Sequence, residues 1–214
     1  KVMAGPEKKS RIISDEEKEN TAYHEVGHAL LSKLLKHCDP LHKVSIIPRG
    51  MALGITMTLP EKDHLTMTKE QLLDQITMTL GGRVAEELVY GKDAITTGAS
   101  NDLEKVTAVA RKMVVSYGMS EKMGNMAYGK SEEHVFMGRD FGHSRDFSEE
   151  IAADIDKEVK KIVDDCYANA TTLLKENRDI VEYISKKLLE EETIDEKEFV
   201  ELMDKIKNER SQNV

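Results

Sequence analysis

The sequence has few of the features that mark several large classes of protein. Only two of its 214 residues are cysteines, Cys38 and Cys166, which is too few for a disulfide framework and suits a reducing compartment. No apolar run approaches the roughly 18 residues of a membrane span, and no signal-peptide pattern follows Lys1. Basic residues number 31 against 40 acidic ones. This balance argues against a nucleic-acid partner, because duplex binding depends on Lys and Arg at the phosphates.

The composition indicates a soluble, helix-rich globular chain, with 39% hydrophobic and 33% charged residues. Its length fits one domain, or one domain with a helical appendage. It opens without Met on a basic stretch, so we expect a fragment of a longer protein. No Gly-x-x-x-x-Gly-Lys-Ser/Thr loop occurs, and we therefore expect no ATP hydrolysis by this chain.

Apolar residues recur at helical spacing over most of the chain. The first helix is expected to begin at Asn20 or Thr21. Further helices are predicted at about 68–90, 102–117, 148–173, 180–189 and 196–206. A short strand near 43–48 ends at Pro48, and because proline is tolerated at the edge of a sheet, we expect an edge strand. A second short strand is predicted near 53–59, and a mobile loop at 119–147.

The motif that carries chemistry is His24-Glu25-Val26-Gly27-His28, inside the first predicted helix. Histidines four residues apart share one face of a helix, so both rings can reach a single ion. Glu25 can then take a proton from a water at that ion, as in zinc hydrolases. Gly27 costs helix stability, which indicates that a backbone or another helix approaches closely there. The plain alternative is a pair of partly exposed histidines on an amphipathic helix.

A catalytic zinc site needs a third protein ligand, and no third histidine follows His28 closely. From the residues alone, three carboxylates are candidates: Glu86 and Glu87 beside the Gly81-Gly82 pair, and Asp102 after a Thr-Thr-Gly loop. The remaining histidines stand in polar or loop settings that are typical of the surface. They are His37, His42, His64, His134 and His143.

Four sequence blocks closely resemble, in order, the peptidase domain of the FtsH family of membrane-anchored, ATP-dependent zinc proteases. They are His24–Ala29, Ile47–Gly54, Leu80–Glu87 and Thr96–Asp102, and Met119–Gly124 continues the match. The resemblance covers most of the first 120 residues. The helical remainder fits the family but carries no motif of its own.

The resemblance implies zinc bound by His24, His28 and Asp102, with Glu86 orienting a ligand histidine. It implies an endopeptidase in which Glu25 is the general base, acting on unfolded, misassembled or short-lived proteins. An ATPase module and a membrane anchor, absent from this chain, would share its full-length polypeptide in a homo-hexameric ring. The expected location is the cytoplasmic face of a bacterial inner membrane, with an organelle membrane as the alternative.

The expected fold class is mainly α, with a small β element and a C-terminal helical bundle. We divide the chain into a zinc catalytic lobe, 1–141, and a C-terminal helical subdomain, 147–210. The strand near 43–48 is a candidate to pair with an extended substrate, adding backbone hydrogen bonds with little side-chain selection. Its proposed contacts are Val44, Ile46 and Ile47.

One rival interpretation is a non-enzymatic helical scaffold with a structural metal site. Structural zinc sites close all four positions with Cys or His. Neither Cys38 nor Cys166 belongs to a ligand pair, and Glu25 would have no role in such a site. A metal-free interaction module is the third interpretation, and metal analysis of the purified protein would test it.

Overall fold

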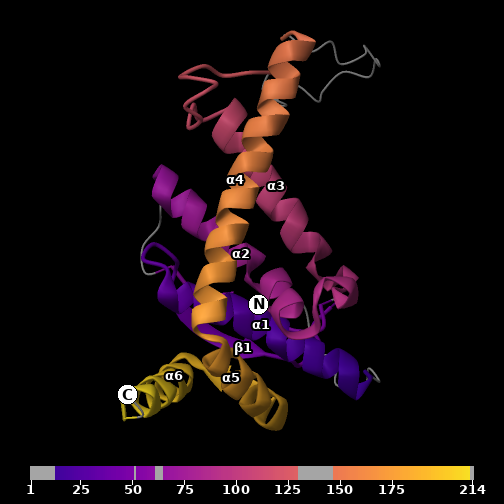
Figure 1. The fold of residues 1–214 in the computed structure, drawn as a ribbon, viewed down its shortest axis with the longest axis vertical. Coiled ribbons are helices and arrows are strands. Elements are labelled where there is room, and N and C mark those ends of the chain that lie inside the picture. Colours follow the sequence, from indigo (N-terminus) through magenta and orange to yellow (C-terminus); the bar gives the residue numbers. More distant parts are fainter. Residues whose placement is uncertain (1–12, 51, 61–64, 130–146, 213–214) are drawn as a thin grey trace.

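A computed structural model describes residues 13–50, 52–60, 65–129 and 147–212. Long helices dominate these ranges, and a small antiparallel sheet accompanies them, which confirms the predicted mainly α class (Figure 1). In chain order the elements are α1 (Asp15–Leu34), β1 (Leu41–Ser45), β2 (Ile55–Thr58), α2 (Lys69–Tyr90), η1 (Lys92–Ala94), η2 (Thr97–Ala99), α3 (Ser100–Val115), α4 (Glu149–Glu176), α5 (Arg178–Glu191), β3 (Thr193–Asp195) and α6 (Glu196–Gln212).

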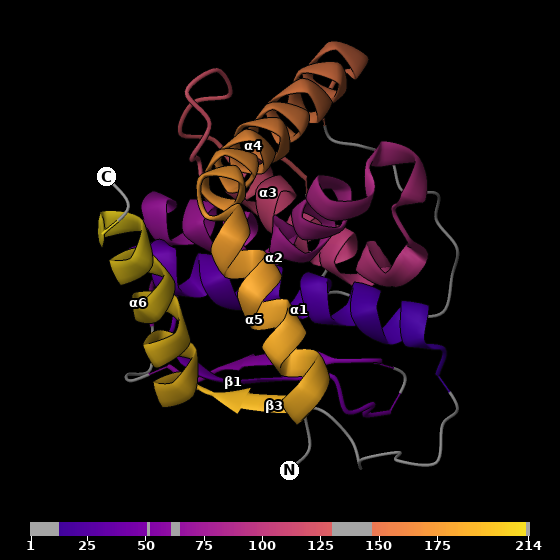
Figure 2. The same ribbon diagram turned by 60° about the horizontal axis from the view of Figure 1, so that its bottom comes forward.

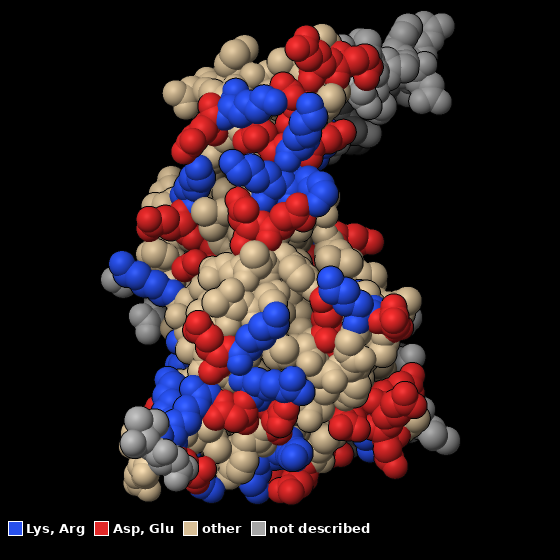
Figure 3. All heavy atoms as spheres, viewed as in Figure 1, with Lys and Arg blue, Asp and Glu red and all other residues tan. Residues whose placement is uncertain are grey.

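Helix α1 begins at Asp15. The predicted start at Asn20 or Thr21 is therefore wrong. Ser14 caps it: its side chain accepts the Glu17 N–H, and the Glu17 carboxylate accepts the Ser14 N–H, each at 3.2 Å. The first turn is acidic, a placement that the helix dipole favours. In Figure 3, acidic side chains gather at the lower right over this end of α1, whereas both signs alternate elsewhere on the face shown.

The sheet has the order β2-β1-β3, so β1 is its central strand and not an edge. Val44 pairs with Thr56 of β2 on one side and with Ile194 of β3 on the other. The predicted edge placement is therefore wrong. Pro48 misled the prediction because it lies beyond the strand, which ends at Ser45, and because β3 arrives from near the end of the chain. The second predicted strand is confirmed as β2.

The central position of β1 removes the basis for the predicted substrate contacts. Val44 is fully buried and Ile46 is buried. The Ile46 N–H donates to the Glu192 carbonyl oxygen at 3.0 Å, and the Ile47 N–H donates to the Ser45 hydroxyl at 3.2 Å. These backbone groups are already used inside the protein, so pairing of an extended substrate with Val44, Ile46 and Ile47 is not proposed further.

Helix α1 lies between the sheet and α2, and α5 crosses it (Figure 2). The main core joins α1 residues such as Leu30 to Val44 of β1, Ile184 of α5 and Phe199 of α6. Helix α4 packs along α2 and α3. Elements from both ends of the chain thus share one core. The proposed boundary between 1–141 and 147–210 falls on residues 142–146, which lie outside the described residues, so the division stays a prediction.

The crossing of α1 over α2 depends on two glycines. A Cβ at Gly27 would lie 2.3 Å from the Gly81 carbonyl oxygen, and one at Gly81 would lie 2.7 Å from the Gly27 carbonyl oxygen. The two backbones are therefore in contact, as the glycine inside the motif predicted. This contact brings His24 and His28 against α2, where their rings find partners.

Two further findings concern segments outside this crossing. Within the described ranges, no helix has the length and apolar character that crossing a membrane requires. Of the loop predicted at 119–147, residues 130–146 lie outside the description. Its first part, 119–129, contains turns but neither helix nor strand. It is anchored by buried Met123, whose carbonyl oxygen accepts the Tyr128 hydroxyl at 2.8 Å.

Candidate metal centre

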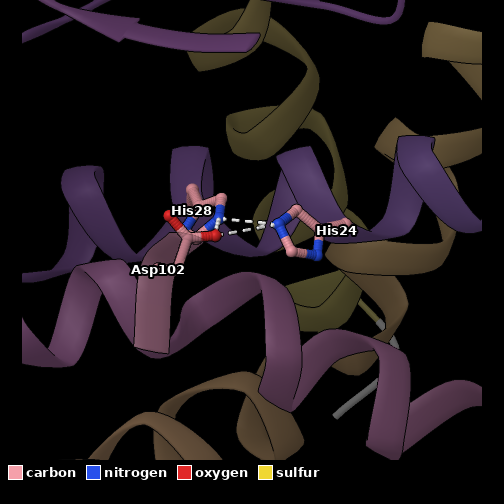
Figure 4. A group of neighbouring side chains, drawn as sticks. All are labelled: His24, His28 and Asp102. Carbon is pink, nitrogen blue, oxygen red and sulfur yellow. Dashed lines mark hydrogen bonds and ion pairs between the residues drawn. The ribbon is translucent and has the colours of Figure 1, made fainter. Parts of the chain in front are cut away.

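Three predicted ligand atoms converge at the start of α3. His24 Nε2 lies 3.1 Å from His28 Nε2 and 3.3 Å from Asp102 Oδ2, and His28 Nε2 lies 3.4 Å from the same oxygen. Figure 4 shows a nitrogen of each ring directed towards the other ring, with the Asp102 carboxylate beside them. Among the described residues this is the one group of three or more His, Cys, Asp or Glu side chains placed to hold a metal ion.

The outer nitrogens of both rings have acceptors that fix their tautomers. His24 Nδ1 lies 2.7 Å from Glu86 Oε1, and His28 Nδ1 lies 2.9 Å from the Met78 carbonyl oxygen. A carbonyl oxygen accepts only, so His28 carries its proton on Nδ1. The ionised Glu86 imposes the same on His24. In their neutral forms both histidines then direct the lone pair of Nε2 at the Asp102 carboxylate, an arrangement that is stabilised either by a metal ion between them or by an added proton on a ring.

The protonation equilibria agree with a site built for positive charge. Burial alone would lower the pKa of His24, but hydrogen bonds to Asp102 and Glu86 and the charge of Glu25 outweigh it and raise that pKa to about 9. Burial would raise the pKa of Asp102, yet hydrogen bonds from His24 and His28 hold it well below its usual range. Burial likewise opposes ionisation of Glu86, whose pKa is lowered by hydrogen bonds from His24 and Thr96.

The spacing of the three atoms fits a tetrahedral ion. Zinc bonds of about 2.0–2.2 Å require ligand atoms about 3.3–3.6 Å apart in a tetrahedron. The observed separations, 3.1 to 3.4 Å, need only a slight expansion. Two imidazoles and one carboxylate are also a ligand set that zinc takes in catalytic sites, where the fourth position is left for water. The residues present therefore fit Zn²⁺.

Glu25 is held beside this group by the β2 strand. The Thr56 hydroxyl lies 2.7 Å from Glu25 Oε2 and 2.9 Å from the Glu25 carbonyl oxygen, so it can donate to either. A Cβ at Gly54 would come within 2.8 Å of Glu25 Oε1. Glu25 is 8% exposed and lines the same cleft as the three candidate ligands. Its carboxylate is thus held on the wall of that cleft by its contact with Thr56.

The structure separates the other candidates from this centre. Glu86 is almost fully buried, and its carboxylate contacts Nδ1 of His24. It therefore lies beside a candidate ligand histidine, where the sequence predicted it. Glu87 points elsewhere, accepting a hydrogen bond from Tyr167 with Lys92 at 3.7 Å. Two of the other histidines are also away from it: His37 pairs with Asp74 and His42 is exposed on β1. His64, His134 and His143 lie outside the described residues.

Several residues that shape the centre were missed from the sequence. The Met78 carbonyl has no sequence signal, because any residue supplies one. Thr56 and Thr96 stand in or near the family-like blocks, but nothing in their spacing shows that they contact acidic side chains. The sequence pointed to Gly82 only as part of the Gly81-Gly82 pair beside Glu86 and Glu87. The structure shows that its neighbour is the His24 ring, 2.4 Å from where a Cβ would be.

We expect Gly82→Ala to weaken zinc binding by about tenfold or more, because the added methyl displaces the His24 ring from its ligand position. Alanine favours a helix over glycine by about 1 kcal/mol, so helix α2 itself should not be weakened. Competition with a chromophoric chelator measures the affinity, and far-UV circular dichroism controls for folding. Unchanged zinc affinity in a folded Gly82→Ala protein would show that the ring is free to move aside.

The fold and this site together indicate the class of protein to which the chain belongs. The chain is mainly helical, and its His-Glu-x-x-His helix and a distant aspartate can hold one metal ion. The sequence profile described as Peptidase family M41 matches residues 11–202. The chain belongs to this family.

Curated relatives agree with this assignment. The ATP-dependent zinc metalloprotease FtsH 1 of Thermoanaerobacter sp. is 52% identical over 199 residues, covering 93% of this chain and 32% of that protein. The ATP-dependent zinc metalloproteases FtsH of Rubrobacter xylanophilus and Myxococcus xanthus are each 54% identical over 195 residues, covering 91% of this chain and 30% of theirs. The chain thus spans about a third of the length of these relatives.

Proposed function

We propose that this chain is the zinc-dependent endopeptidase part of an FtsH-type, ATP-dependent protease. The observation that carries the proposal is the convergence of His24, His28 and Asp102 within 3.4 Å of one another, with Glu25 in the same cleft. Membership of Peptidase family M41 and relatives named as zinc metalloproteases support it.

The reaction would be hydrolysis of a peptide bond by water. Zn²⁺ held by His24, His28 and Asp102 would supply Lewis acidity, polarising the scissile carbonyl and acidifying the attacking water. The Glu25 carboxylate takes the proton of that water and delivers it to the leaving amine, so the carbon–nitrogen bond breaks with no net change in the protein. Thr56 keeps this carboxylate oriented. Glu86 holds the His24 ring by its Nδ1 proton.

The β2 strand is the element that we propose pairs with the substrate. Among the described residues β2 pairs only with β1, so its outer edge has no strand partner there. Ile55, Thr56 and Thr58 line the cleft of about 1160 Å³ that also contains the candidate ligands. An extended polypeptide added along this edge would gain backbone hydrogen bonds with little dependence on its side chains. That property suits the degradation of many different unfolded proteins.

The remaining features of the whole protein are proposals from the family. An ATPase module elsewhere in the full-length polypeptide would unfold substrates and feed them to this domain. The peptidase domains would assemble as a homo-hexamer. The full-length protein would be anchored at the cytoplasmic face of a bacterial inner membrane or, alternatively, at an organelle membrane.

The direct experiment compares cleavage and folding after zinc removal. The zinc-loaded chain is expected to cleave unfolded casein without ATP, since unfolded chains need no ATPase module to reach the cleft. Phenanthroline should abolish cleavage while far-UV circular dichroism keeps its helical signal, because the core around α1 does not depend on the ion. Added zinc should restore cleavage.

The same experiment tests the structural-metal alternative. If chelation unfolds the helices, the ion is structural and the scaffold interpretation is favoured. If the metal-free protein cleaves casein at the zinc-loaded rate, then hydrolysis at this centre is wrong.

A further inference from the structure

The segment that delivers Asp102 to the metal centre has few apolar anchors. Residues 91–98, between α2 and α3, are all exposed, and Ala99 is the first buried residue after them. Asp102 follows in the first turn of α3. Since burial contributes little to holding this segment, its polar contacts must decide where α3 starts and therefore where the carboxylate lies.

Thr96 collects most of these contacts. Its N–H and its hydroxyl both donate to Glu86 Oε2, at 2.8 and 3.1 Å. The hydroxyl oxygen accepts the Gly98 N–H at 3.1 Å, which caps η2, and the Thr96 carbonyl oxygen accepts from Arg83 Nη2 at 2.8 Å. Every polar group of this residue is thus engaged with α2 or with the turn that leads to α3.

The Glu86 carboxylate joins this segment to the first ligand. Its Oε1 accepts from His24 Nδ1 at 2.7 Å while its Oε2 accepts from Thr96, and the side chain is 1% exposed. One buried carboxylate therefore sets the rotation of the His24 ring with one oxygen and the position of the α3 approach with the other. Charge-assisted bonds of this kind are stronger than neutral ones.

We propose that Thr96 is a positioning residue for metal binding. Through Glu86 it fixes the distance between His24 on α1 and Asp102 on α3, so that the ligands are preassembled before the ion arrives. The inference deepens the proposed function and rests on zinc being the ion bound. Loss of the Thr96 hydroxyl leaves Glu86 Oε2 with one donor fewer in a buried place, and it removes the cap of η2. Both changes loosen the α3 approach relative to His24.

The test is the zinc affinity of Thr96→Val, measured by competition with a chromophoric chelator. We expect about tenfold weaker binding, in the range seen when outer partners of metal ligands are removed. Thr96→Ser keeps the hydroxyl and should restore the wild-type affinity, which loss of methyl packing alone would not predict. Thr107→Val is the matched control: its exposed hydroxyl bonds the Leu103 carbonyl oxygen on the same helix as Asp102, but not the centre.

A spectroscopic measurement separates ligand placement from general stability. The visible bands of the Co²⁺-substituted protein report the ligand geometry, and they should change in Thr96→Val but not in Thr107→Val or Thr96→Ser. If Thr96→Val does not fold, Thr96→Ala serves as the second variant that lacks the hydroxyl.

The outcomes distinguish this inference from the proposed function. Wild-type affinity in the folded hydroxyl-lacking variant overturns the inference alone, as does an equal loss in Thr107→Val or a failure of Thr96→Ser to recover. A wild-type chain that binds no zinc overturns both.

Discussion

Glu25→Gln is expected to lower the rate of casein cleavage by about a thousandfold while the protein keeps its zinc. Glutamine has the shape of glutamate but cannot accept a proton, and removal of a general base costs about 10²–10⁴ in rate. Zinc should stay because Glu25 is not among the three converging ligands. The Thr56 hydroxyl can still donate to the amide oxygen, so the side chain should keep its place. Metal analysis and cleavage of labelled casein measure the two effects.

Glu87→Gln is the matched control for this substitution. Glu87 contacts Tyr167 and Lys92 and does not line the cleft, so the same change of charge there should leave cleavage intact. Wild-type cleavage by Glu25→Gln would refute the proposed mechanism. Loss of zinc from Glu25→Gln would instead show that this carboxylate helps to hold the ion.

The helices were largely predictable because their apolar residues repeat at short range. The helix predicted at 68–90 corresponds to α2, which Thr68 caps. The helix predicted at 148–173 corresponds to α4, which Ser148 caps. The start of α1 was misplaced although its signal was present. Ser14 and Glu17 form a capping box, a pattern that is visible in sequence, but the prediction placed the start at Asn20 or Thr21, after the charged residues of the first turn.

The sheet shows where local pattern stops being informative. Val44 was correctly assigned to a strand from its β-branched neighbourhood, yet its partner Ile194 lies 150 residues later in the sequence. Only three residues form β3, too few for alternation to stand out. Whether a strand is central or at an edge depends on such distant partners, and Pro48 alone could not decide it.

The residues of the candidate site also divide into those that local sequence predicts and one that it does not. His24, Glu25 and His28 were predicted from one local motif, because a spacing of four residues puts both histidines on one face of a helix and the zinc-hydrolase pattern places Glu25 beside the first. Asp102 needed the family resemblance, since local pattern left Glu86 and Glu87 open.

The two glycines at the crossing of α1 and α2 explain why the candidate metal centre lies beside this helix contact. Contact of the α1 and α2 backbones at Gly27 and Gly81 puts His28 within reach of a backbone carbonyl of α2. One residue further, Gly82 leaves room for the His24 ring, and one turn beyond it Glu86 accepts a hydrogen bond from Nδ1 of that ring. Helix α2 therefore contacts the outer nitrogens of both histidines, and in the proposed site the third ligand, Asp102, comes from α3.

Asp102→Ala should weaken zinc binding by at least about a hundredfold, because it removes one of three protein ligands and the negative charge that neutralises the ion. Glu86→Ala is the informative comparison. It keeps all three proposed ligands in the chain and disturbs only their placement, through His24 and through the Thr96 contact that positions the α3 approach, so its loss should be smaller. Chelator competition on both folded variants ranks them. A greater loss in Glu86→Ala, with Asp102→Ala close to wild type, would identify Glu86 as the third ligand and refute the assignment of Asp102.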